Sequence, residues 1–219
     1  MLAKASQSAR LVDLFKVSGL KQTFKKGDYI IRPGDTPSGV YFIEQGLVKA
    51  YDITKYKEEN LLIIRKENEI FPLIWAITGQ ERHVVYQSLA PQTITWRIDR
   101  NLLLDCINKE PEIMAPLLDM TVEMYRLHSE RILNLEYRTV RERIISFLLT
   151  MSQRYAVKQT KDGLMITVPL RHQDIASSIN ASRETTSREL SALDRKGLVT
   201  SQQSFIILKD PAALRQHLR

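Results

Sequence analysis

The sequence predicts an α+β fold in which an antiparallel β-roll or sandwich is followed by a long helix and a small helical domain. Two observations carry this prediction. Between residues 24 and 96 the apolar residues come in short runs, about ten residues apart, as in consecutive β-strands. Beyond residue 101 the apolar residues are instead spaced by alternating steps of three and four, which is the period of a helix.

The N-terminal half is expected to form the β-roll, preceded by a short helix over residues 11–15. Turn-forming residues separate the apolar runs, and glycines such as Gly34 and Gly46 supply the positive φ that other residues resist. Frequent turns between short runs indicate strands that pair antiparallel. The expected strands are residues 29–31, 40–43, 47–51, 61–64, 84–86 and 94–96.

Two apolar stripes run along the helix that is expected after residue 112. One stripe is suited to cover the β-roll and the other to meet the same helix of a second subunit, because steps of three and four form the seam of a coiled coil. An ordinary core helix is the alternative, since the seam is short. Pro116 predicts a kink or a fresh helix start, because proline lacks a backbone N–H. The first stripe consists of Ile113, Leu117, Met120, Met124 and Leu127, and the second of Leu118, Val122, Tyr125 and Ile132.

The chain length of 219 residues suits two domains of about 100 residues each. A further amphipathic helix over residues 138–155 begins the second domain. We therefore expect a β-roll domain over residues 1–110, a long helix and hinge over residues 111–137, and a C-terminal domain over residues 138–219.

The net charge of +7 lies entirely in this C-terminal domain. Residues 1–137 hold 18 Lys and Arg against 18 Asp and Glu, whereas residues 138–219 hold 14 against 7. A basic domain beside a neutral one is typical of a protein in which one domain binds a polyanion. A basic surface that is merely solvated is the alternative.

The composition excludes several classes of protein. The 43% hydrophobic and 26% charged residues are typical of a globular chain. The longest apolar stretch, residues 71–77, is far shorter than the roughly 20 residues of a membrane span, and no secretory signal is visible, so the cytoplasm is the expected compartment. Cys106 is the single cysteine, so neither an iron–sulfur cluster nor a zinc site with several cysteines is expected. The motifs of common enzyme classes are absent, and no catalytic residue is expected.

Residues 170–197 predict a helix-turn-helix. The first helix is expected over about residues 171–179. Asn180 tolerates the left-handed conformation that the turn requires. Ser182 is suited to cap the second helix, and Gly197 is suited to end it. A short hairpin over residues 198–208 follows and is interpreted as a wing.

The second helix of this motif carries the candidate contacts to double-stranded DNA. A helix fits the major groove, where Arg can bond O6 and N7 of a guanine and Glu can accept from a cytosine amino group. A glutamate beside an arginine at the helix tip favours base reading over non-specific binding, because it would otherwise repel phosphates. An unrelated helical hairpin is the alternative. The expected base-reading residues are Arg183, Glu184, Ser187 and Arg188, the expected phosphate contacts are Arg171, Gln173, Ser182 and Thr185, and the expected buried stripe is Thr186, Leu190 and Leu193.

The chain resembles the Crp/Fnr superfamily of transcription regulators over nearly its whole length. One motif is the segment of residues 26–46, which contains Lys-Gly-Asp, Pro-Gly-Asp and Val-Tyr-Phe-Ile-Glu-Gln-Gly. The other is Ser-Arg-Glu-Thr at residues 182–185, followed by Ser-Arg at residues 187–188. The resemblance implies a jelly-roll of the cyclic-nucleotide-binding type, a winged helix-turn-helix, and a homodimer that forms through the long helix at about residues 112–136.

The resemblance also implies which DNA is bound. Dimers of this family bind inverted repeats whose half-sites resemble TGTGA or TTGAT. Glu184 and Arg188 match family positions that read G·C pairs, and Arg183 matches a further guanine reader of the catabolite-activator branch. Ser187 matches the Fnr branch instead, which leaves the outer bases of the half-site open. RNA polymerase is the implied partner if the protein is an activator.

The sequence departs from the family pattern at the effector site. Arg82 is retained, but Pro72 stands where the family has a ribose-binding glutamate, so cyclic AMP is not expected. The iron–sulfur sensor of Fnr is excluded by its missing cysteines. Arg82, His83, His128 and Ser129 are the expected lining of an effector pocket. The two histidines suggest a pH switch, haem or metal ligation, but no complete set of metal ligands is visible, so satisfied or exposed histidines are favoured and no metal is expected.

Three functional hypotheses remain open at this point. The first is a DNA-binding regulator that responds to an effector in the β-roll. The second is a regulator without an effector that is controlled by its abundance. The third is a ligand-binding signalling module that does not act on DNA, against which the charge division counts.

Overall fold

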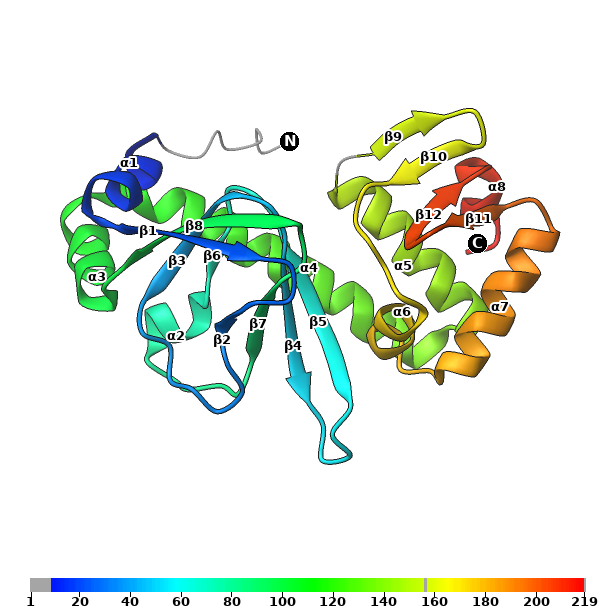
Figure 1. Cartoon of the computed structure of the whole chain (residues 1–219), viewed down its shortest axis with the longest axis horizontal. Helices are drawn as coiled ribbons and strands as arrows, with labels where there is room; N and C mark the ends of the chain where they lie inside the picture. The colour runs from blue at the N-terminus through cyan, green and yellow to red at the C-terminus, as the bar shows by residue number, and fades with distance from the viewer. Residues whose placement is uncertain (1–8, 156, 219) are drawn as a thin grey trace. The chain divides into compact units, whose positions relative to one another are not determined.

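The computed structural model describes residues 9–155 and 157–218 (Figure 1). By their internal contacts the described residues divide into two units. The first unit holds residues 9–58 and 62–126, and the second holds residues 59–61, 127–155 and 157–218. The first unit contains a β-roll, and the second contains a helical domain with a small sheet. No helix among the described residues is long and apolar enough to cross a membrane.

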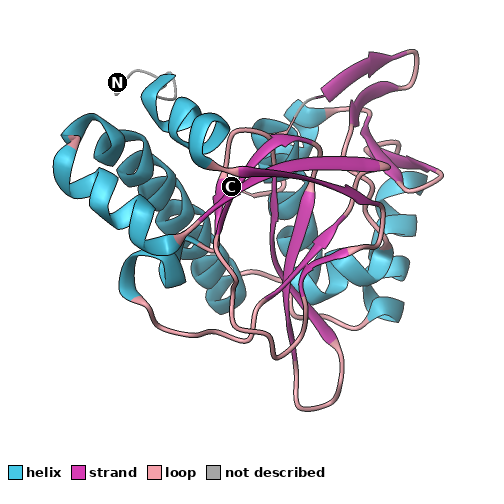
Figure 2. Ribbon diagram, turned by 60° about the vertical axis from the view of Figure 1, so that its left-hand side comes forward, coloured by secondary structure: helices cyan, strands magenta, loops and turns pink. Residues whose placement is uncertain are grey.

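Two four-stranded sheets form the β-roll of the first unit (Figure 2). Their strands pair antiparallel, as predicted, with Val40 opposite Ile98 in one sheet and Tyr51 opposite Val85 in the other. Each predicted strand is present, with ends close to those expected. The first sheet has the order β1 (Leu20–Lys25), β8 (Gln92–Ile98), β3 (Val40–Gln45) and β6 (Ile70–Phe71), and the second has the order β2 (Tyr29–Ile31), β7 (Val85–Ser88), β4 (Val48–Ile53) and β5 (Glu59–Arg65).

The first unit also contains elements that the sequence does not predict. Besides β1 and β6, these are the helices α2 (Leu73–Thr78) and α3 (Arg100–Lys109), and α1 (Ala9–Ser18) is longer than expected. α2 lies in an apolar stretch, where periodicity alone cannot separate a short helix from a buried strand. α3 is capped by Asp99, whose carboxylate accepts from the backbone N–H of Asn101 at 2.7 Å.

The interior of the roll is apolar and aromatic. Tyr41, Phe71 and Tyr86 stack in a row, with ring centroids 5.2 and 4.7 Å apart. A second cluster joins α1, α2 and α3 to the first sheet, and its fully buried members include Phe15 and Phe42. Burial of such side chains is the main favourable term in folding, at about 25 cal/mol per Å² of apolar surface.

The long helix α4 (Met114–Tyr137) follows a short 3-10 turn at Pro111–Ile113. The predicted fresh start is confirmed, and Pro116 lies in the first turn, where the missing N–H has no partner to lose. Ile113 and Leu117, from the first predicted stripe, are 1% and 3% exposed within the core of the first unit. The first part of that stripe, together with the half-buried Met120, therefore packs against the β-roll core as predicted, whereas Leu127 belongs to the second unit.

The second unit is built on α5 (Val140–Arg154), whose N-terminus is closed by a capping box between Thr139 and Glu142. The predicted helix-turn-helix and wing are confirmed, whereas the first hairpin of the small sheet and the last helix are not predicted by the sequence. The remaining elements are β9 (Val157–Thr160), β10 (Gly163–Ile166), α6 (His172–Ser178), α7 (Arg183–Arg195), β11 (Val199–Gln202), β12 (Phe205–Leu208) and α8 (Pro211–Gln216), and the sheet order is β11, β12, β10, β9.

Candidate nucleic-acid interface

A tight turn connects α6 to α7. Asn180 adopts a left-handed φ of 50°, as predicted for a residue type that tolerates this conformation. The N–H of Ala181 donates to the carbonyl of Ala176 at 3.0 Å, which closes the turn. The two helices are thus joined by a fixed bend of the kind found in helix-turn-helix motifs.

Both predicted ends of α7 are confirmed. Ser182 Oγ accepts from the backbone N–H of Thr185 at 3.1 Å and so caps the first turn. At the other end Gly197 has a φ of +70°, and the N–H of Leu198 donates to the carbonyl of Leu193 at 3.1 Å. The predicted buried stripe of α7 is present, with Thr186, Leu190 and Leu193 at 0%, 4% and 0% exposure.

The opposite side of α7 presents the predicted base-reading residues. Arg183, Glu184 and Arg188 are exposed, and Ser187 is half-buried. Within the described part of the chain, no hydrogen bond or ion pair engages the side chains of Arg183, Glu184 or Arg188. Their polar groups are therefore available to a ligand that approaches the N-terminal half of α7, where the positive end of the helix dipole adds to the arginine charges.

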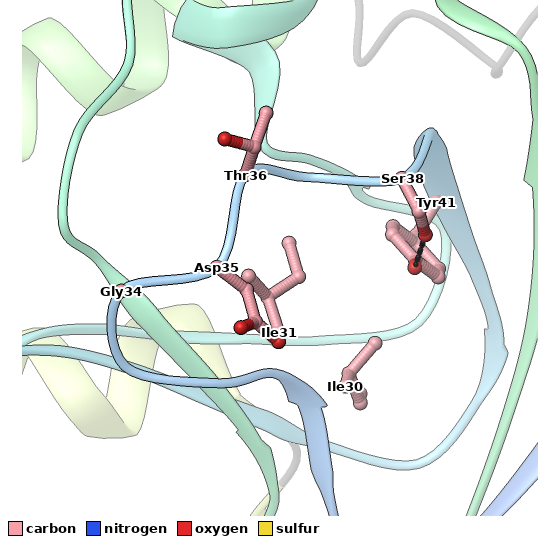
Figure 3. A pocket seen from close by; sticks show the side chains of 7 residues that line it. All are labelled: Ile30, Ile31, Gly34, Asp35, Thr36, Ser38 and Tyr41. Carbon is pink, nitrogen blue, oxygen red and sulfur yellow. Dashed lines mark hydrogen bonds between the residues drawn. The ribbon is translucent and has the colours of Figure 1, made fainter.

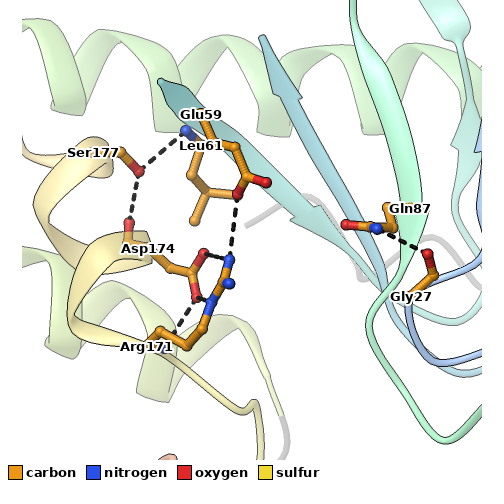
Figure 4. Close-up of polar contacts among 7 residues, drawn as sticks. All are labelled: Gly27, Glu59, Leu61, Gln87, Arg171, Asp174 and Ser177. Carbon is orange, nitrogen blue, oxygen red and sulfur yellow. Dashed lines mark hydrogen bonds and ion pairs between the residues drawn. The ribbon is translucent and has the colours of Figure 1, made fainter. Parts of the chain in front are cut away.

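The predicted phosphate contacts are more varied in their surroundings. Arg171 donates two hydrogen bonds of 3.0 Å to Asp174, from Nε to Oδ2 and from Nη2 to Oδ1. Its Nη2 also donates to Glu59 Oε2 at 3.3 Å (Figure 4). The hydrogen bond with Asp174, followed by the charges of both carboxylates, raises the pKa of Arg171 despite partial burial. Gln173 is half-buried, and Ser182 and Thr185 form the cap of α7.

The contacts of Arg171 with both carboxylates could not be found from the sequence. Asp174 is three residues away and on the same helix turn, but Glu59 lies far away in the chain. Near this pair, Ser177 Oγ accepts from the backbone N–H of Leu61 at 3.2 Å, so residues 59–61 are bonded to α6 within the second unit (Figure 4). Because Arg171 donates to Asp174 and Glu59, part of its donor capacity is already used inside the protein.

The wing lies beside these helices as the hairpin of β11 and β12. Its tip turns at Gln203, which has a φ of 57°, and Gln202 and Gln203 are exposed. The carbonyl of Ser204 accepts from the N–H of Leu170 at 2.7 Å, which ties the wing to the segment that leads into α6. The tip carries amide and hydroxyl side chains but no charge.

The four predicted effector residues lie in different parts of the chain. Arg82 and His83 are exposed on the loop that precedes β7, in the first unit. His128 is exposed and Ser129 half-buried on α4, in the portion assigned to the second unit. Among the described residues, no group of three or more His, Cys, Asp and Glu side chains is arranged to hold a metal ion.

The buried phenol of Tyr86 lies inside the β-roll. Burial raises the pKa of Tyr86, whereas the positive charges of Arg65 and Arg82 act in the opposite direction. Arg65 is 8% exposed, and its Nη1 lies 3.5 Å from Glu69 Oε2.

The first unit also has a cavity of about 330 Å³ that the sequence does not predict (Figure 3). The hydroxyl groups of Ser38 and Tyr41 are 3.0 Å apart at its wall, and Arg97 Nη1 donates to Ser38 Oγ at 3.0 Å. None of the predicted effector residues lines it. The lining consists of Ile30, Ile31, Gly34, Asp35, Thr36, Ser38 and Tyr41.

Comparison with known protein families agrees with this arrangement. Residues 142–217 match the family described as a Crp-like helix-turn-helix domain, and residues 21–110 match the cyclic nucleotide-binding domain. The chain belongs to the Crp/Fnr family of transcription regulators. Members of this family are DNA-binding regulators and not enzymes, as the sequence predicts.

Two curated relatives of this Crp/Fnr regulator match it over most of its length. The global nitrogen regulator of Synechocystis sp. is 29% identical over 202 residues, which cover 89% of this chain and 87% of the relative. The nitrogen fixation regulation protein FixK of Azorhizobium caulinodans is 26% identical over 216 residues, which cover 97% of this chain and 84% of the relative.

Solved structures show the same fold. FixK2 from Bradyrhizobium japonicum aligns with a TM-score of 0.76 at 24% identity and covers 90% of this chain and 96% of its own. The global regulator CLP of Xanthomonas campestris, described as responsive to c-di-GMP, aligns with a TM-score of 0.79 at 19% identity and covers 93% of this chain and 100% of its own. The predicted α+β fold class is confirmed.

Proposed function

We propose that this Crp/Fnr regulator binds an inverted-repeat DNA site as a homodimer, with one α7 in the major groove of each half-site. The observation that carries the proposal is the N-terminal half of α7, where Arg183, Glu184 and Arg188 are exposed and make no side-chain bond to another described residue. Base-edge readers need donors and acceptors that the protein itself does not use.

The chemistry of these side chains suggests what each reads. Arg183 and Arg188 are suited to guanine O6 and N7, and Glu184 to a cytosine amino group. Ser187 adds a short hydroxyl that fits either a donor or an acceptor. A half-site in which G·C pairs stand beside T·A pairs, such as TGTGA or TTGAT, is compatible with this set.

Phosphate contacts are proposed on both sides of the reading helix. Ser182 and Thr185 lie at the N-terminus of α7, where backbone N–H groups and the helix dipole favour anions. Gln173 and Arg171 lie at the start of α6. We expect Arg171 to contribute through the donor capacity that Asp174 and Glu59 leave unused, since its side chain is 63% exposed.

The homodimer is proposed to form through the second apolar stripe of α4. Leu118, Val122, Tyr125 and Ile132 expose 58%, 55%, 75% and 62% of their surface. A row of large apolar side chains at steps of four, three and seven residues is seldom left in water and matches the heptad seam of a two-helix coiled coil. α4 has 24 residues and is therefore about 36 Å long, which is enough for several turns of contact.

An effector site in the β-roll is a further part of the proposal. Arg82 and His83 are the candidates in the first unit, and His128 and Ser129 are the candidates on α4. Cyclic AMP is not proposed, because Pro72 offers neither a side-chain acceptor nor a backbone donor for a ribose. A regulator that has no effector and is controlled by its abundance is the alternative. A protein that acts on chromosomal DNA in a bacterium works in the cytoplasm, so we propose this compartment. If the protein activates transcription, we propose that it contacts RNA polymerase.

Fluorescence anisotropy with symmetric and scrambled duplexes tests this proposal. We expect the symmetric duplex to bind at least about a hundredfold more tightly at moderate ionic strength, as specific sites usually do. Sedimentation analysis of the free protein should give a dimer. Equal affinity for both duplexes, or a monomer that binds without pairing, would contradict the proposal.

A further inference from the structure

A second acidic residue lies on the reading helix, outside the set of base readers. Glu189 follows Arg188 directly and stands four residues after Thr185, so it shares the flank of α7 that we propose to face a DNA phosphate. A free carboxylate on that flank would repel the phosphate and oppose binding. The position of Glu189 therefore needs an explanation.

The structure shows where the Glu189 carboxylate points. Arg141 Nε donates to Glu189 Oε2 at 2.7 Å, from the first turn of α5. The Glu189 side chain is only 20% exposed, whereas that of Arg141 is 41% exposed. The carboxylate is thus turned back against α5, which packs on α7 within the second unit (Figure 1).

We infer that Arg141 is a positioning residue for DNA binding, which holds and neutralises Glu189 so that this flank of α7 can approach a phosphate. The inference rests on the proposed DNA-binding role of α7. A charge-assisted hydrogen bond of this length is among the stronger side-chain contacts and keeps its acceptor in one place. The arginine acts through Glu189 and needs no contact with DNA of its own.

Two other roles for Arg141 make different predictions. If Arg141 contacted a phosphate directly, its loss would weaken binding whether or not Glu189 carried a charge. If the ion pair only stabilised the fold, removal of either partner would lower the free energy of unfolding, and the DNA affinity would fall only as far as the stability does. If Arg141 acts by neutralising Glu189, loss of Arg141 should weaken DNA binding and loss of the Glu189 charge should not. Removal of the Glu189 charge should then restore binding in a protein that lacks Arg141.

The test is a double-mutant cycle on the full-length protein, with the symmetric duplex in anisotropy titrations at several salt concentrations. We expect Arg141→Ala to weaken binding about tenfold, since it leaves a free carboxylate beside the phosphate. We expect Glu189→Gln alone to bind as well as the unaltered protein or better. The double variant should return to within about threefold of the unaltered protein, because no charge is left to repel.

Control measurements separate this inference from its rivals. Arg195→Ala removes one positive charge from an exposed position near the end of α7 and should change affinity less than about twofold, since distant exposed charges are screened. Thermal unfolding of each variant reports on the fold. A double variant as weak as Arg141→Ala, or a Glu189→Gln variant as weak as Arg141→Ala, would overturn the inference. If the unaltered protein did not discriminate the symmetric duplex, the proposed function itself would fail.

Discussion

Arg143 of α5 donates a hydrogen bond of 2.7 Å from Nη1 to the backbone carbonyl of Ile179, the C-cap residue of α6. The same Nη1 lies 3.4 Å from the carbonyl of Asn180, in the turn before α7. The last carbonyls of a helix have no partner within the helix and must be satisfied from outside. One arginine of α5 therefore anchors the bend that sets the direction of the reading helix.

Arg143→Ala should destabilise the second unit and weaken DNA binding together. We expect a loss of about 2 kcal/mol in the free energy of unfolding, because a charged donor is removed from a partly buried carbonyl. Urea titration followed by circular dichroism measures this loss. Arg143→Lys keeps the charge but loses the planar donor group. Its free energy of unfolding should therefore lie between those of the unaltered protein and Arg143→Ala. Unchanged stability in Arg143→Ala would show that water replaces the anchor.

Arg188→Ala should weaken binding to the cognate duplex by about 1–3 kcal/mol, because a bidentate contact with a guanine is lost. The preference for the symmetric duplex should fall as well, since Arg188 is proposed to read a base. Anisotropy titrations of both duplexes measure the two effects. The matched control is Arg195→Ala, on the same helix but beyond the proposed contact. A variant that lost affinity equally for every duplex would assign Arg188 to a phosphate.

Val122→Asp should convert the protein to monomers and weaken DNA binding. The substitution places a charge in the centre of the exposed stripe of α4, where burial against a second helix would cost several kcal/mol. Sedimentation equilibrium measures the association. Asp119→Lys alters the charge at an exposed position that lies about 60° from Val122 and about 100° from Leu118 around the helix, at the edge of the stripe, and should leave the dimer intact. A dimeric Val122→Asp protein would place the subunit interface elsewhere.

Local patterns in the sequence predict most of the fold. The strands around Val40 and Val85 are found because short apolar runs alternate with turn residues, and the ends of α7 are found because Ser182 and Gly197 are chemically suited to cap a helix. The strand β1 is missed because its residues Leu20–Lys25 are largely polar and exposed, so no apolar run marks them.

The sequence says less about what the site residues touch. The exposure of the proposed base-reading residues on α7 can be predicted from helical spacing, because this spacing fixes the side of the helix on which a residue lies. The bonds from Arg141 to Glu189 and from Arg171 to Glu59 join residues that are 48 and 112 positions apart. Such contacts depend on the packing of separate elements, and no local pattern of charges selects one partner among several.

The stability of the first unit should depend on the ionisation of Glu44. The hydrogen bond from Lys21, followed by those from Trp96 and Lys16, lowers the pKa of Glu44 below its ordinary value of 4.5, although burial acts the other way. Lys21 Nζ lies 3.0 Å from Glu44 Oε2. Because the folded-state pKa is lower than the unfolded one, the ionised carboxylate stabilises the fold above pH 4.5, and this stabilisation is lost as the pH falls through the folded-state pKa.

Glu44→Gln should therefore reduce the free energy of unfolding at pH 7 by at most about 1 kcal/mol, the usual worth of a partly exposed ion pair. At about pH 3 the difference from the unaltered protein should shrink, because Glu44 of the unfolded chain, with its ordinary pKa of 4.5, is then mostly protonated and folding must remove that proton to form the ion pair. Urea titration at both pH values measures the change. Glu112→Gln removes an exposed carboxylate and should have little effect at either pH. A Glu44→Gln deficit that stayed constant between the two pH values would contradict this prediction, because the amide differs from the ionised carboxylate chiefly in charge and the charge of Glu44 changes with pH.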